Sequence, residues 1–163
     1  MVLQKTETPS WDRQTVATLL AGKRVAVVAS RFNAMICEGL LGGALGALES
    51  LGVTGQQVDV FRVPGAFDVP VVAKKVAASG NFAGVVALGC VIRGETPHFE
   101  FVSLAATLGC LQAALDTSCP VTFGVITVNT ESQALERSGV NNANKGREAT
   151  LALLETLETL RRL

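Results

Sequence analysis

Short apolar runs and amphipathic stretches alternate along nearly the whole chain. The runs RVAVVAS and AGVVALGCVI are rich in valine and carry almost no charge, which is typical of strands buried on both faces of a sheet. The run QVDVFRV alternates between apolar and polar residues, which also indicates a strand. We predict four strands, over residues 24–30, 57–63, 83–92 and 120–128.

Apolar residues at helical spacing fill the intervals between these strands. In the first interval Asn33 can cap a helix and Gly52 can end it. The apolar residues between them recur at helical positions, namely Ile36, Leu40, Leu41, Ala44, Leu48 and Leu51. Further helices are predicted over residues 67–79, 97–117, 130–136 and 145–162.

Prolines and leucines add detail to the later helices. Pro70 is expected to interrupt the helix at 67–79 near its start. Pro97 suits the first turn of the following helix, because an N–H has no intrahelical partner there. The last helix is expected to place four leucines on one stripe: Leu151, Leu154, Leu157 and Leu160.

A strand is followed by a helix four times over, which predicts right-handed βαβ units. We therefore expect an α/β fold of three αβα layers around a four-stranded parallel sheet. The body of this fold spans residues 23–163. Residues 1–22 precede the first strand, and we predict that they form an arm on the surface or on a neighbouring copy.

The composition fits one compact domain. Of the 163 residues, 48% are hydrophobic and 17% are charged, which excludes general disorder. Fourteen basic residues offset fourteen acidic ones, so no bulk charge indicates nucleic acid or an anionic membrane. We see no secretory signal and no run that approaches the ~18 apolar residues of a membrane span. We expect a cytoplasmic protein with no nucleic-acid or membrane partner.

The cysteines give no sign of a metal site. Cys37, Cys90, Cys110 and Cys119 form no CxxC pair, and each lies in an apolar context. The pattern favours four reduced, packed thiols. With a single histidine and no cysteine cluster, we expect no metal.

Candidate chemistry lies in the loops that follow the strands. In an open parallel sheet, ligands bind beyond the carboxyl ends of the strands, near the point where strand order reverses. These loops contain Phe32 and the sole histidine, His98, whose imidazole can move protons near neutral pH. The amides of Glu95 and Thr96 can hold a phosphate or carboxylate at a helix N-terminus. Structural alternatives remain: Phe32 can pack under a helix, His98 can be a surface residue, and the GETP turn can be only a helix entry.

Several common motifs are missing, and two cations stand out. There is no GxGxxG after the first strand, no GxxxxGKS and no GxSxG, which disfavours dinucleotide, P-loop and acyl-hydrolase sites. Arg137 and Lys145 flank an Asn-rich loop late in the chain. As an alternative to a role in a site, Arg137 can complement a helix dipole and Lys145 can be a solvated first-turn residue.

Five segments, in order, resemble the lumazine synthase family: RFN, VPGAFDVP, ALGCVIRGETPHFEFV, PVTFGVITV and QALERSGVNNANKG. The resemblance runs from Val25 to Leu160 and implies a flavodoxin-like, doubly wound fold. It also implies a transferase of riboflavin biosynthesis that uses no cofactor. Such an enzyme condenses 5-amino-6-(D-ribitylamino)uracil with 3,4-dihydroxy-2-butanone 4-phosphate to 6,7-dimethyl-8-ribityllumazine, phosphate and water.

The resemblance implies a role for each residue of the site. Phe32 is implied to stack on the pyrimidine ring. The ribityl chain is implied to be held by Ala66, Phe67 and Asp68, and the uracil edge by the main chain of Cys90, Val91 and Ile92. His98 is implied to transfer protons, Glu95 and Thr96 to line the phosphate subsite, and Arg137 to be its main cation. Lys145 is implied to be catalytic and Phe123 to bind substrate. By family analogy, Phe123, Arg137 and Lys145 come from the adjacent subunit.

The chain departs from the family pattern in two places. The family commonly has Glu where this chain has Asp68, which is one methylene shorter. Many relatives also carry an acidic residue within the segment that here reads FVSLAATLG. Its absence leaves His98 without one potential neighbour.

The resemblance further implies a homo-oligomer, because the site is shared between subunits. We expect a pentamer. The short link from Gly139 to Lys145 favours closure of pentamers into a sixty-subunit icosahedral capsid. Riboflavin synthase is an expected partner beside the small-molecule substrates. Two alternatives stay open: a non-catalytic flavin- or lumazine-binding paralogue, and a shell-forming scaffold whose activity is incidental.

Overall fold

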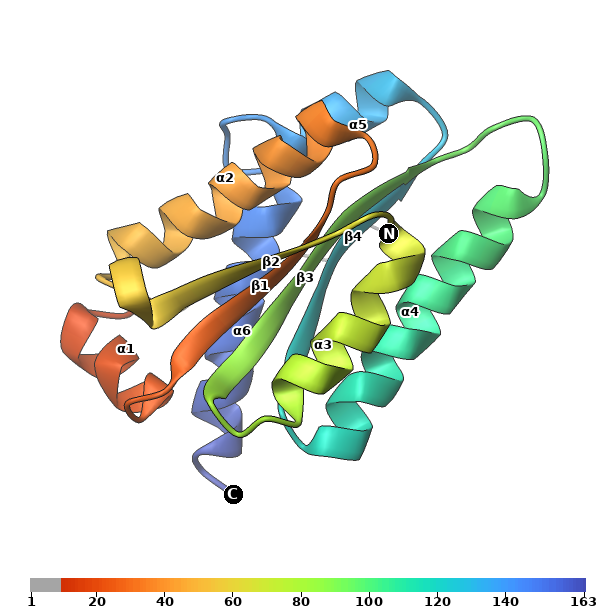
Figure 1. Ribbon diagram of the computed structural model, residues 1–163. Helices are drawn as coiled ribbons and strands as arrows, with labels where there is room; N and C mark the ends of the chain where they lie inside the picture. The colour runs from red at the N-terminus through yellow and green to blue at the C-terminus, as the bar shows by residue number, and fades with distance from the viewer. Residues whose placement is uncertain (1–9) are drawn as a thin grey trace.

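The computed structural model describes residues 10–163 and has three layers, with a sheet between two layers of helices (Figure 1). All neighbouring strands are parallel, and their order is β2-β1-β3-β4. The strands are β1 (Arg24–Ser30), β2 (Val58–Val63), β3 (Phe82–Ile92) and β4 (Val121–Val128). The predicted doubly wound αβα fold with a four-stranded parallel sheet is confirmed, and each strand end lies within one residue of its prediction.

Helices cover both faces of the sheet. They are α1 (Arg13–Leu20), α2 (Ala34–Ser50), α3 (Val69–Ala77), α4 (His98–Thr117), α5 (Glu131–Ser138) and α6 (Lys145–Leu160), with short 3-10 turns η1 (Gly55–Gln57) and η2 (Ala66–Asp68). On one face α2 packs beside α6, and on the other α3 packs beside α4 (Figure 1). The predicted helices are therefore confirmed.

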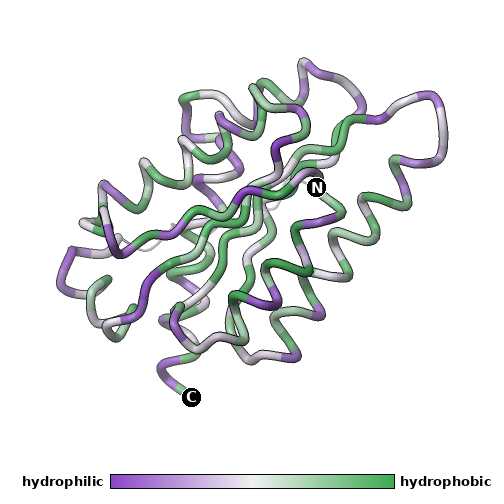
Figure 2. The backbone as a smooth tube through the Cα atoms, viewed as in Figure 1, coloured by the Kyte–Doolittle hydropathy of each residue, from purple (hydrophilic) through white to green (hydrophobic). Residues whose placement is uncertain are grey.

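The central strand β1 is buried on both faces. Successive side chains of a strand point to opposite faces. Val25 and Val27 accordingly join a core cluster with α2 and α6, whereas Ala26 and Val28 join a second cluster with α3. This double burial explains the unbroken apolar runs in the sequence, and Figure 2 shows hydrophobic residues concentrated along the strands at the centre of the molecule.

Pro70 does not interrupt a helix. The segment after β2 forms η2 first, and α3 begins at Val69, so that Pro70 occupies the first turn of α3. A first-turn residue needs no N–H for an intrahelical bond, so proline is tolerated there. The prediction of an early interruption is wrong because the helix starts later than its apolar pattern indicated.

The predicted leucine stripe on α6 is also wrong. Leu154 is fully buried, but Leu160 is exposed, and the neighbouring Leu153 is fully buried instead. A spacing of three residues falls about 60° short of a full helical turn at each step, so four such leucines spread around half the helix. The buried face of α6 follows the three-and-four spacing of Gly146, Ala149, Thr150, Leu153 and Leu154.

Residues 10–22 contain a helix that the sequence did not predict. Asp12 caps α1 by accepting a hydrogen bond from the amide of Thr15 (2.7 Å), and Val16 and Leu20 join the core cluster that includes α6. This part of the predicted arm therefore packs on its own chain. Residues 1–9 of that arm lie outside the described residues, and the division between residues 22 and 23 stays a prediction.

One described helix, α4, is long and apolar enough to cross a membrane by length and composition alone. The expectation that no segment approaches this limit counted unbroken apolar runs, whereas α4 intersperses its apolar residues with Ser, Thr and Gln. Averaged over 18 residues, its mean hydropathy is 1.3. In the fold α4 lies along α3 and β4 as part of a covering layer (Figure 1).

The four cysteines are free thiols. Cys37, Cys90 and Cys110 are buried, and Cys119 is half-buried. The predicted packed, unpaired thiols are thus confirmed. Within residues 10–163, no three His, Cys, Asp or Glu side chains gather in a group that could hold a metal ion.

Candidate active site in two halves

The order of the strands reverses beside β1. The chain passes from β1 to β2 on one side and then crosses back to β3 on the other, so the connections diverge at the carboxyl ends of β1 and β3. A cavity of about 370 Å³ opens at this point, and we name it the first cavity. Its lining comes from the loop after β1, the turn after β2, the end of β3 and the start of α4.

The loop after β1 presents Phe32 to this cavity. The amide of Phe32 donates to the carbonyl of Pro64 (3.0 Å), and the Cys37 thiol donates to the carbonyl of Phe32 (3.1 Å). These contacts hold the backbone while the ring stays 69% exposed. The alternative that Phe32 packs under the following helix is therefore wrong, and its ring is available to a flat ligand.

Asn33 does not cap α2 with its side chain. Its backbone is left-handed (φ 57°), a conformation that asparagine tolerates better than most residues. Its side-chain amide donates instead to the carbonyl of Cys90 (3.1 Å). The predicted side-chain cap is wrong, and Asn33 instead ties the Phe32 loop to the end of β3.

The turn after β2 places two further predicted residues at the first cavity. Ala66 is buried and Phe67 is 64% exposed, and both line the cavity. Asp68 does not line it. Its carboxylate accepts a hydrogen bond from the amide of Gly65 (2.9 Å), so it closes its own turn.

The end of β3 and the start of α4 complete the first cavity. Cys90, Val91 and Ile92 line it together with Thr96 and His98, whereas Glu95 is exposed outside it. His98 is the first residue of α4, and it is exposed. The only histidine thus lies in the same cavity as the exposed ring of Phe32.

Arg93, which no sequence pattern singled out, holds the loop that precedes His98. Its guanidinium pairs with the carboxylate of Glu100, donates from Nε to Asn129 Oδ1 (3.0 Å) and stacks 4.3 Å from the centre of the Phe99 ring. The hydrogen bond from Arg93 lowers the pKa of the Glu100 carboxyl. Arg93 and Glu100 are seven residues apart, and outside a helix this spacing does not determine whether two side chains meet. The ion pair therefore could not be predicted from the sequence.

The thiol of Cys90 is unsuited to nucleophilic chemistry at neutral pH. Burial raises its pKa to about 12, so the thiol remains protonated. Burial also raises the pKa of Cys37. Neither thiol is therefore suited to exchange protons near neutral pH.

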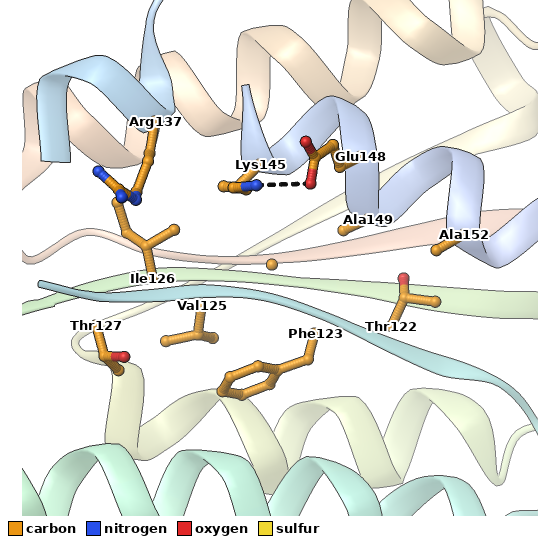
Figure 3. Close-up of a pocket in the computed structure, with 11 residues that line it drawn as sticks. Thr122, Phe123, Val125, Ile126, Thr127, Arg137, Lys145, Glu148, Ala149 and Ala152 are labelled. Carbon is orange, nitrogen blue, oxygen red and sulfur yellow. Dashed lines mark hydrogen bonds and ion pairs between the residues drawn. The ribbon is translucent and has the colours of Figure 1, made fainter. Parts of the chain in front are cut away.

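A second cavity of about 380 Å³ lies against the edge strand β4, with α5 and α6 beside it (Figure 3). Lys145 Nζ pairs there with Glu148 Oε2 (2.8 Å), and Arg137 Nη1 donates to the carbonyl of Gln133 (2.9 Å). Arg137 lies in the last turn of α5, as its helix-end alternative requires, but this bond uses one of its five N–H groups, so a role in a site stays open. Glu148 was missed, although its i,i+3 spacing from Lys145 is typical of a helical ion pair.

Phe123 lies on β4 at the same cavity but on the other side of the strand. In Figure 3 its ring points to the face of the sheet that α3 and α4 cover, whereas Arg137 and Lys145 approach from the side of α5 and α6. Phe123 is 41% exposed, and no strand within residues 10–163 pairs with β4 on its outer side. The three residues expected from an adjacent subunit thus gather at one edge of the molecule.

The predicted site residues divide between two cavities that share no lining residue. The first contains Phe32, Ala66, Phe67, Cys90, Val91, Ile92, Thr96 and His98. The second contains Phe123, Arg137 and Lys145. Asp68 and Glu95 line neither, and their predicted roles in binding stay predictions.

Comparisons with known proteins show the family of the chain. A family model described as 6,7-dimethyl-8-ribityllumazine synthase matches residues 22–161. The chain is 50% identical over 140 residues to 6,7-dimethyl-8-ribityllumazine synthase 1 of Caulobacter vibrioides. This match covers 86% of the chain and 92% of the relative. It is 48% identical over 142 residues to the 6,7-dimethyl-8-ribityllumazine synthase of Syntrophus aciditrophicus. This match covers 87% of the chain and 92% of the relative. The chain belongs to the 6,7-dimethyl-8-ribityllumazine synthase family.

Proposed function

We propose that the chain condenses 5-amino-6-(D-ribitylamino)uracil with 3,4-dihydroxy-2-butanone 4-phosphate, releasing 6,7-dimethyl-8-ribityllumazine, phosphate and water. One observation supports this most directly. The only histidine and an exposed phenylalanine ring line one cavity at the switch point of the sheet, in a chain that matches the family over residues 22–161. The reaction is the formation of riboflavin's lumazine precursor.

The first cavity suits the pyrimidine substrate. The ring of Phe32 offers a face for stacking. β3 pairs with β1 only as far as Leu88 but with β4 as far as Ile92. The main-chain groups of Ile92 on the β1 side therefore lie beyond the last β1 partner, where they can hydrogen-bond the polar edge of a uracil, whereas those of Val91 face β4. Ala66 and Phe67 border the position of the ribityl chain.

His98 is the proposed proton-transfer residue. Imine formation, loss of phosphate and ring closure each move a proton, and imidazole can give and take protons near neutrality. The departing phosphate carries negative charge, which a guanidinium and amides at a helix N-terminus stabilise. We assign these roles to Arg137 and to the amides of Glu95 and Thr96 before α4, with Lys145 as a second cation.

The two cavities require two copies of the chain for a complete site. In addition, α4 exposes a row of large apolar side chains, each more than half exposed: Phe101, Leu104, Leu108, Leu111 and Leu115. Their helical spacing forms one continuous face, which water would solvate unfavourably. We propose that copies pack on this face in a homo-oligomer that joins the first cavity of one copy to the second cavity of the next.

The finer features of the assembly follow from the family resemblance. We propose a cytoplasmic pentamer, and the short link from Gly139 to Lys145 favours its closure into an icosahedral capsid. Association with riboflavin synthase is proposed on the same basis.

The direct test is to mix the purified protein with both substrates and to follow lumazine fluorescence and free phosphate together. Equal amounts of lumazine and phosphate are expected. A well-folded, assembled sample that binds flavin tightly but forms neither product would instead favour the non-catalytic paralogue.

A further inference from the structure

Asn144 is a buried polar residue that contacts three helices or their ends. It is 2% exposed. Its Nδ2 donates to the carbonyls of Gly39 in α2 (3.0 Å), Ser138 at the end of α5 (2.9 Å) and Gly139 just beyond it (2.9 Å). A primary amide has two N–H groups, so one of them is shared between two of these acceptors.

The other end of the same side chain begins α6. Asn144 Oδ1 accepts hydrogen bonds from the amides of Gly146 (2.9 Å) and Arg147 (3.1 Å). The last carbonyls of one helix and the first amides of the next both lack intrahelical partners. Asn144 supplies partners to both ends at once.

Glycines make room for this contact. A Cβ at Gly43 would lie 2.0 Å from Asn144 Oδ1, and a Cβ at Gly146 would lie 1.9 Å from the carbonyl oxygen of Leu40. The backbones of α2 and α6 can therefore approach closely enough to enclose the amide. A side chain at Gly146 would displace one of the helices, and a side chain at Gly43 would displace the amide of Asn144.

Along the chain, Asn144 lies between the two cations of the second cavity. Arg137 directly precedes Ser138, whose carbonyl accepts from the amide, and Lys145 directly follows Asn144. The two side chains reach the cavity from different helices (Figure 3). Their relative placement thus depends on the link between α5 and α6, which the amide of Asn144 fastens to α2.

We propose that Asn144 is a positioning residue that sets the separation of Arg137 and Lys145, and through it the affinity for the phosphate-bearing substrate. This inference rests on the proposed function. Asn144 touches neither substrate. It acts by holding two cations at one spacing, so that a single phosphate can meet both.

Asn144→Ser separates this role from helix capping. Serine retains an oxygen that caps α6, but it has no amide to donate to the carbonyls of α2 and α5. The matched control is Asp12→Ala, which removes the cap of α1 at a helix remote from the second cavity. Gly43→Ala is a second test, because its added Cβ displaces the amide from the side of α2 while Asn144 itself is kept.

Steady-state kinetics with each substrate varied in turn is the readout, with calorimetric binding of inorganic phosphate as a measure independent of turnover. We expect Asn144→Ser and Gly43→Ala to raise the KM for the phosphate-bearing substrate and the Kd for inorganic phosphate about tenfold, and to leave the KM for the pyrimidine nearly unchanged. Asp12→Ala leaves all three constants unchanged.

The outcomes separate the two proposals. An inactive wild-type protein overturns the proposed function, and phosphate binding then still decides whether Asn144 positions the cations. If the wild type is active and both variants shift the two KM values equally, or neither, Asn144 serves stability alone and the inference is wrong.

Discussion

His98 is the first residue of α4, and its exposed side chain lines the cavity that Phe32 also lines. Replacing it leaves the fold untouched, because an exposed side chain takes no part in the core. We expect His98→Ala to lower kcat by about 100-fold, the usual contribution of a positioned acid–base group, with little change in either KM. Stopped-flow lumazine fluorescence measures this. An unchanged kcat would remove His98 from the mechanism.

Arg137 is predicted to act on one substrate only. We expect Arg137→Ala to raise the KM for the phosphate-bearing substrate at least about tenfold, because a charge-assisted contact to phosphate is lost. The exposed Arg161 at the end of α6 provides the control, since Arg161→Ala removes the same charge elsewhere. Equal effects of the two substitutions on KM would mean that net charge alone matters.

Buried thiols set an alkaline limit to stability. The folded-state pKa values of Cys90 and Cys110 are raised by burial to about 12 and about 11, above the ordinary value of 9.0. Above that value the folded chain binds more protons than the unfolded chain, so stability is complete below pH 9.0 and is lost as pH rises through 11 and 12. Urea unfolding at rising pH measures the loss. The double Cys90→Ala, Cys110→Ala variant is expected to show a shallower decline.

At the scale of single residues, the sequence predicted which chemical groups gather at a cavity better than it predicted their hydrogen-bond partners. It placed His98 and Phe32 together because both follow parallel strands, whose ends share one edge of the sheet. The partners of Asn33 and Asp68 were predicted less well. A short polar side chain bonds whichever backbone group its own φ and ψ bring near, and a pattern of residue types does not contain those angles.

At the scale of elements, α2 and α6 approach one another through glycine. A methyl group at Gly146 would meet the backbone carbonyl of Leu40, whereas one at Gly42 would meet nothing within 4 Å. We expect Gly146→Ala to cost about 2 kcal/mol through overpacking. Gly42→Ala, in the middle of a helix, is expected to gain up to about 1 kcal/mol from helix propensity. Thermal unfolding of the two variants side by side tests this, and equal melting temperatures would contradict it.

The elements themselves were predictable because the core demands a regular pattern. Strands such as β1 must be apolar on both faces, and α2 must be apolar at three-and-four spacing, so both were predicted closely. Errors arose where the pattern was blurred. Pro70 looked like a break because the start of α3 was placed too early, and the leucines of α6 recur at a spacing that does not keep to one face.

At the scale of the whole molecule, the apolar face of α4 is the surface on which we propose that copies assemble. A carboxylate at Leu108, in the middle of that face, would have to be buried without a partner if copies pack there. We expect Leu108→Glu to dissociate the oligomer and to abolish turnover, as sedimentation velocity and the coupled fluorescence assay would show. Leu163→Glu, at a residue that is 98% exposed and outside α4, is the control. An assembled and active Leu108→Glu protein would exclude α4 from the interface.

The spacing of residues along one chain could not predict that the candidate site residues divide between two cavities. Periodicity reports which side chains face the core of their own fold. It cannot tell a surface that meets water from one that meets another copy, so Phe123, Arg137 and Lys145 were assigned to a neighbour only through family resemblance. The structure adds that they lie at the edge strand β4, in a cavity that shares no residue with the first.

The separateness of the two cavities also has a consequence for inheritance. If neighbouring copies share each site as proposed, a cell with one allele lacking His98 and another lacking Arg137 makes no intact polypeptide. Mixed assemblies nevertheless join an intact first cavity from one gene product to an intact second cavity from the other at about one site in four. Two impaired alleles then complement each other when they damage different halves of the site, and fail to do so when they damage the same half.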